Sequence, residues 1–86
     1  MFDKEETLKI CRNIVQNAKC NEDNFERICS YYYFLCSSFE ALERYENEYG
    51  KAEFDSPEAK TLWEKITNTK NNIYKDIAII AIFSAL

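Results

Sequence analysis

Apolar residues recur in alternating steps of three and four through the middle of the chain, between residues 21 and 49. The apolar members of this seam are Phe25, Ile28, Tyr32, Leu35, Phe39, Leu42 and Tyr49. Only Glu46 interrupts the seam, and the stretch contains neither Gly nor Pro. The pattern predicts one long amphipathic helix over 21–49, with Asn21 as its N-cap and Gly50 as its C-cap.

Two further helices are predicted on either side of this segment. The N-terminal helix is expected over 3–19, because Asp3 and Glu6 have the spacing of a capping box. The C-terminal helix is expected over 56–85, where Ser56 precedes a proline at the first helical position. Residues 67–72 are weak helix formers, and we expect a solvated turn of a continuous helix there rather than a kink.

The short connections between these helices predict how they pack. Consecutive helices joined by a few residues lie antiparallel and side by side. Segments 30–36 and 77–83, which are apolar on nearly every side, then meet where all three helices overlap. The sequence therefore predicts a single all-α domain, a three-helix bundle with two long antiparallel helices and a shorter N-terminal helix.

The three-helix end has more apolar residues than a small core can cover. Tyr31, Phe34, Ile79 and Ile82 fall off the seams, and Phe83 closes the last apolar run. Exposed apolar patches usually mark interfaces, so we expect these residues to form the contact of a homodimer. The alternative is that they pack on one another within one protomer.

The other end of the hairpin has an aromatic set, which is a second candidate interface. Tyr45, Tyr49 and Trp63 lie on either side of the predicted loop over 50–55 and Phe54 lies within it, so we expect the four to be close together. Trp and Tyr are the commonest anchors of protein interfaces. The set is either a minor core that closes the hairpin or a docking patch with an acidic rim. The rim residues are Glu46, Glu48, Glu53 and Asp55.

Composition and charge narrow the class of protein. The chain has 86 residues, enough for one domain, and its net charge is −4 with only three scattered arginines. Nucleic-acid binding is therefore not expected, because it depends on clustered basic residues. The start lacks a secretory pattern, and the longest apolar run is about a third of a bilayer-spanning length, so membrane association is not expected. We expect a cytosolic protein, in the host cytosol if the abundance of Lys, Asn and Ile reflects a virus or phage.

The residues of common catalytic sites are missing. There is no His, which excludes Ser-His-Asp and His-ligand sites, and a single Gly leaves no glycine-rich phosphate loop. Cys11, Cys20, Cys29 and Cys36 have no CxxC spacing, and we expect free thiols that pack as small apolar residues. Cys20 lies between two predicted helices and is the thiol we expect to be most accessible. No enzyme activity, cofactor or metal is expected.

These observations favour a non-enzymatic helical module for protein–protein interaction, such as a small cytosolic inhibitor, adaptor or regulatory protein acting as a homodimer. One alternative is an acidic nucleic-acid mimic that blocks a nucleic-acid-binding protein, which requires carboxylates gathered along one face. Another is a membrane-apposed, immunity-type protein that uses the apolar segment 77–86.

Overall fold

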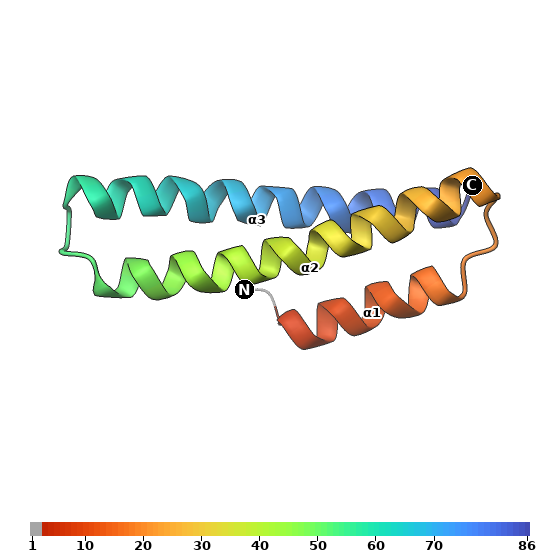
Figure 1. Ribbon diagram of the computed structural model, residues 1–86, viewed down its shortest axis with the longest axis horizontal. Helices are drawn as coiled ribbons and strands as arrows, with labels where there is room; N and C mark the ends of the chain where they lie inside the picture. The colour runs from red at the N-terminus through yellow and green to blue at the C-terminus, as the bar shows by residue number, and fades with distance from the viewer. Residues whose placement is uncertain (1–2) are drawn as a thin grey trace.

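The computed structural model describes residues 3–86, and three α-helices account for most of that range. They are α1 (Lys4–Gln16), α2 (Glu22–Lys51) and α3 (Pro57–Ser84). The two long helices form an antiparallel hairpin, and α1 lies along the N-terminal half of α2 and contacts both (Figure 1). The expected all-helical fold, with the two longer helices packed against each other, is confirmed.

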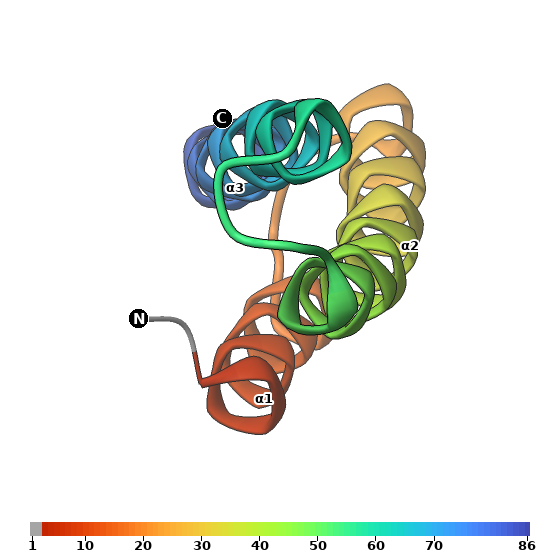
Figure 2. The same cartoon turned by 90° about the vertical axis from the view of Figure 1, so that its left-hand side faces the viewer.

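The molecule is a rod with principal-axis extents of 49 × 19 × 16 Å. Viewed along the rod, the three helices form a triangular arrangement rather than a flat layer (Figure 2). Since α1 is short, the rod has a three-helix end and a two-helix end. The two-helix end contains the loop that joins α2 to α3.

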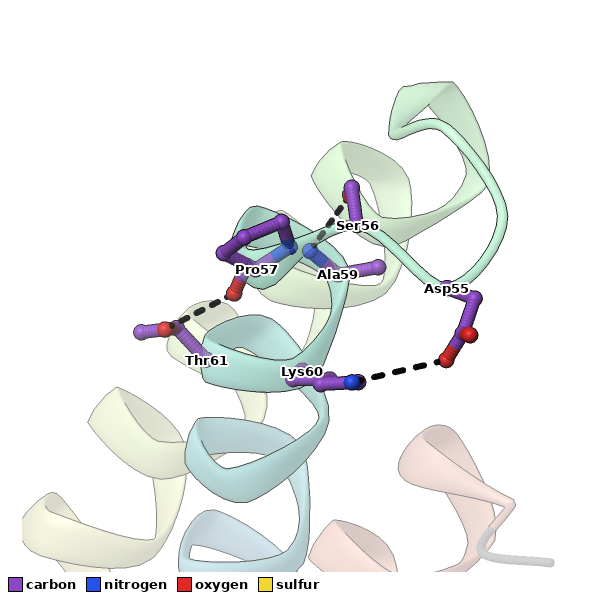
Figure 3. A network of polar contacts seen from close by, with 6 residues as sticks. All are labelled: Asp55, Ser56, Pro57, Ala59, Lys60 and Thr61. Atoms are coloured by element: carbon purple, nitrogen blue, oxygen red, sulfur yellow. Dashed lines mark hydrogen bonds and ion pairs between the residues drawn. The ribbon is translucent and has the colours of Figure 1, made fainter.

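The start of each helix is set by a local side chain. Asp3, Asn21 and Ser56 have extended backbones, and each accepts a hydrogen bond from the N–H three residues later, at 3.1, 2.9 and 3.1 Å. Figure 3 shows the Ser56 cap and Pro57, the residue that follows it in the sequence. These short polar side chains satisfy N–H groups that have no partner within the helix. All three N-caps agree with the sequence prediction.

The helix ends differ from the prediction. Helix α1 stops at Gln16 and not at 19. At its C-cap, both the backbone N–H and the side-chain amide of Asn17 donate to the Asn13 carbonyl, at 3.1 and 2.9 Å. A side chain that bonds the backbone in this way offers it an alternative to further helix. Ala18 is still half-buried, so the apolar periodicity continues past the helix itself.

Gly50 is not the C-cap of α2. It lies within the helix without a positive φ, and a Cβ added there would meet no atom within 4 Å. The helix ends at Lys51 with the extended Ala52 as its C-cap, and the chain reverses at Asp55, whose φ is 59°. The left-handed residue therefore comes five positions later than expected, at an Asp, which tolerates that conformation better than most residues.

One cluster of buried apolar side chains runs along the rod and draws on all three helices. Its members are Cys11, Leu35, Phe39, Leu42, Ile66, Ile73 and Ile80. Phe25 belongs to the predicted seam but is 43% exposed. Near the end of α3, the guanidinium carbon of Arg27 lies 4.7 Å from the centre of the Phe83 ring.

Helix α3 continues without a break through residues 67–72, as expected. Thr69 and Lys70 are half-buried and occupy the seam between Ile66 and Ile73. The Thr69 hydroxyl donates to the Lys65 carbonyl at 2.7 Å, which satisfies it within its own helix. Weak local propensity is outweighed here by the packing of the flanking apolar turns.

Candidate functional site: the aromatic tip

The two-helix end, defined as residues 46–65 and called the tip below, exposes three aromatic side chains. Tyr49, Phe54 and Trp63 are 38%, 98% and 55% exposed. The Tyr49 and Trp63 ring centres are 5.7 Å apart, and the rings are tilted by 44°. Together with Asp55, Ala59 and Lys60, the three aromatics line a hollow of about 240 Å³. A neighbouring hollow of about 250 Å³ shares Tyr49, Phe54 and Ala59.

Each aromatic side chain of the tip comes from a different element. Tyr49 lies in the last turns of α2, Phe54 in the connecting loop and Trp63 in the second turn of α3. The buried residues in the first turns of α3 are Ala59 and Leu62. Trp63 follows Leu62 directly in the sequence and lies outside the core. Three of the four residues of the aromatic set therefore lie outside the buried core.

Tyr45, the fourth member of the predicted aromatic set, is placed differently. It is half-buried and packs against the core cluster. The Arg44 guanidinium carbon and the Lys65 ammonium nitrogen lie 5.3 and 5.6 Å from the centre of its ring. Tyr45 therefore supports the hairpin and already has two cations beside it.

Most of the net negative charge of the protein is at the tip. Six acidic and three basic side chains lie between residues 46 and 65, a net charge of −3 out of −4 for the whole chain. All nine are exposed, including the four predicted rim acids. Asp55 Oδ1 and Lys60 Nζ are 3.7 Å apart at the edge of the hollow (Figure 3). Both side chains are largely exposed, so this ion pair contributes little to stability.

The structure divides the residues predicted at the three-helix end into two groups. Phe34 and Ile82 are 52% and 58% exposed. Tyr31, Ile79 and Phe83 are half-buried. The Tyr31 ring meets that of Phe34 edge to face, with 5.6 Å between centres. Three of the five residues thus pack within the protomer, and two are left on its surface.

The four cysteines are free thiols in different environments. Cys11 is buried, and burial raises the pKa of its thiol, with a smaller contribution from Cys36. Cys20 and Cys36 are half-buried, whereas Cys29 is exposed. Cys29 follows the buried Ile28 by one residue, which is about 100° around a helix, so it lies off the seam. The expectation that Cys29 packs in the core is wrong, and Cys29 is more accessible than Cys20.

Asp76 is a buried carboxyl group that the sequence reading missed. It lies on α3 and is only 6% exposed. Desolvation raises the pKa of its carboxyl group, and the nearby Lys75 opposes that shift. Its spacing could have revealed it, because it is three residues after Ile73 and four before Ile80, both of which are seam residues.

Residues 3–86 contain no group of three or more His, Cys, Asp or Glu side chains placed to hold a metal ion. In the same range, none of the helices combines the length and the apolar character that crossing a bilayer requires. Comparisons of the chain with protein-family models, curated proteins and solved structures found no match.

Proposed function

We propose that this chain is a non-enzymatic protein-binding module, an adaptor, inhibitor or regulator that contacts its partner through the tip. The observation that carries the proposal is the exposure of Tyr49, Phe54 and Trp63 around one hollow. Phe54 is 98% exposed and contributes almost nothing to the core. Aromatic side chains of this kind bury a large area when a partner covers them, and they dominate the energetics of many interfaces.

The hairpin is a suitable support for such a contact. Tyr49 and Trp63 are part of two helices that pack against each other along the rod, and their rings already touch. Binding therefore costs little conformational entropy at these two side chains, and a smaller entropic cost favours affinity. Phe54 lies in the loop and supplies an adaptable third contact.

We further propose that the protein acts as a homodimer in the cytosol, joined through the three-helix end. The molecule exposes 6167 Å², whereas a compact monomer of its mass would expose about 5300 Å². The difference is similar to the roughly 800 Å² that each partner buries in an interface of standard size. Phe34 and Ile82 supply exposed apolar side chains at that end, and four free thiols suit a reducing compartment.

Affinity capture with the full chain, followed by mass spectrometry, tests the role of the tip. Phe54→Ala should reduce the amount of captured partner at least about tenfold, since truncating an interface anchor weakens binding by that factor or more. Tyr33→Ala is the matched control, because Tyr33 is 73% exposed on α2 and lies outside the tip. Partner recovery that is unchanged in Phe54→Ala and in Trp63→Ala would contradict the proposal. Neither exposed side chain is needed for the core, and circular dichroism checks that both variants fold.

A further inference from the structure

We propose that the tip binds a basic segment of the partner protein, with one arginine side chain seated in the hollow that Tyr49, Phe54 and Trp63 line. This inference rests on the proposed function and specifies the chemistry of the partner. It follows from the open aromatic rings, from the local charge and from the exposed Asp55 at the edge of the hollow.

The rings at the tip present faces that attract cations. Aromatic faces are electron-rich, and an arginine guanidinium stacks on Trp or Tyr more readily than a lysine ammonium does. The rings of Tyr49 and Trp63 are inclined by 44° with 5.7 Å between centres, and both side chains remain partly exposed. A hollow of about 240 Å³ far exceeds the 10–15 Å³, roughly, that one water molecule needs. It therefore has room for a side chain.

The protein itself shows this chemistry elsewhere. The guanidinium carbons of Arg27 and Arg44 lie 4.7 and 5.3 Å from the ring centres of Phe83 and Tyr45. Within residues 3–86, by contrast, no cation of the chain lies over the rings of the three tip aromatics. The aromatic faces at the tip are therefore open to a cation from another molecule.

The charge at the tip favours a basic occupant. The net charge of −3 over residues 46–65 attracts a segment rich in Arg and Lys and repels an acidic one. All of the acidic side chains of the tip are exposed. Net negative charge and exposed aromatic rings thus occur in the same region, and both favour the binding of a cationic side chain.

Asp55 supplies a carboxylate for the incoming guanidinium. Its present partner is Lys60 at 3.7 Å, a long contact between side chains that are 73% and 69% exposed. An exposed pair of this kind is easily exchanged. Arginine can form two parallel hydrogen bonds with a carboxylate, whereas lysine cannot. The exchange of Lys60 for a partner arginine on Asp55 is therefore favourable.

Fluorescence offers a direct test, because Trp63 is the only tryptophan of the chain. We expect titration with tetra-arginine amide to change Trp63 emission saturably. Tetra-lysine amide should bind at least about fivefold more weakly, and tetra-glutamate should give no change. The absence of saturation with tetra-arginine, or equal half-saturation by the arginine and lysine peptides, would overturn the inference.

Two substitutions locate the binding site and one controls for charge. Tyr49→Leu and Asp55→Asn should each weaken tetra-arginine binding at least about threefold. Glu40→Gln removes the same charge from an exposed position of α2 outside the tip, and it should leave the binding unchanged. Equal weakening by Glu40→Gln and Asp55→Asn would show general charge attraction and would overturn the site.

The two proposals fail in different ways. Loss of the captured partner in Phe54→Ala, with no tetra-arginine binding, would leave the tip as the docking site and overturn the arginine site. Tetra-arginine binding that depends on Tyr49 and Asp55, with a captured partner indifferent to Phe54→Ala, would support the cation site and remove the proposed function.

Discussion

At the scale of single residues, Asp76 is the side chain whose environment conflicts most with its chemistry. It is the one charged residue buried within the described range 3–86. Removing a carboxylate from water disfavours its charged form, which is why the pKa of Asp76 is raised. Lys75, next in sequence, offsets part of this effect. The cost of burial therefore appears only when the carboxyl group is ionised.

Asp76→Asn should make the free energy of unfolding less dependent on pH. The folded-state pKa of Asp76 lies above its unfolded value, so the folded protein keeps this proton where the unfolded chain has lost it. The free energy of unfolding consequently falls as pH rises from about 4 through the folded pKa. The variant escapes that loss and should be more stable by about 1 kcal/mol near pH 7.

Urea unfolding of both proteins between about pH 4 and about pH 7 measures this difference. Lys75→Gln serves as the companion variant, because it removes the opposing charge and should steepen the pH dependence of the wild-type carboxyl group. Parallel pH profiles for wild type and Asp76→Asn would contradict the predicted role of burial.

At the scale of helices, beginnings and ends have different origins. The N-caps depend on one short polar side chain and a backbone N–H three residues away, so they are local. The end of α2 depends on where the chain can reverse to meet α3, and that happens at Ala52 and Asp55. Gly50 is left inside α2, where it needs none of the conformational freedom of glycine.

Gly50→Ala should therefore stabilise the protein. Alanine restricts the unfolded chain and favours the helix, and no atom lies within 4 Å of the added methyl group. We expect a gain of about 0.5 kcal/mol, near the lower limit for glycine in a helix because the position is close to the terminus. The midpoint of thermal unfolding should rise by about 2–4 °C. A lower midpoint would mean that Gly50 adopts a left-handed conformation in solution.

At the scale of the whole molecule, the short α1 determines the shape. It covers only half of the hairpin, so the radius of gyration is 15.2 Å, whereas a compact chain of this length would have about 12 Å. A rod of this kind exposes much surface for its mass. Phe34 and Ile82 lie in the half of the rod that α1 covers, and Tyr49, Phe54 and Trp63 lie at the other end, so the proposed dimer contact is separate from the tip.

Analytical ultracentrifugation between about 1 and about 200 µM tests the proposed dimer, because dimerisation depends on concentration. We expect the mass to rise toward twice the 10.2 kDa of one chain. Phe34→Glu should weaken the association at least about tenfold, since it places a charge in an apolar contact. Phe54→Glu adds the same charge at the tip and should leave the association unchanged. A monomer over the whole range would contradict the homodimer.

The amino-acid sequence by itself determined the three helices, their N-caps and most of the core positions. Helical periodicity and capping act over a few residues, so they can be read from the order of side chains alone. Leu35, Phe39 and Leu42 are buried as their spacing predicts. Short connections then leave little choice but an antiparallel hairpin with a third helix beside it.

Only the tertiary structure decided which apolar residues are covered and which remain open. Trp63 and the neighbouring Leu62 both suit an apolar seam, yet Leu62 is buried and Trp63 forms part of the tip. Phe25 belongs to the predicted seam of α2 yet is 43% exposed, whereas the carboxyl group of Asp76 is buried at a seam position of α3. Burial depends on what the neighbouring helices place at the same level of the rod, and those neighbours are far away in sequence.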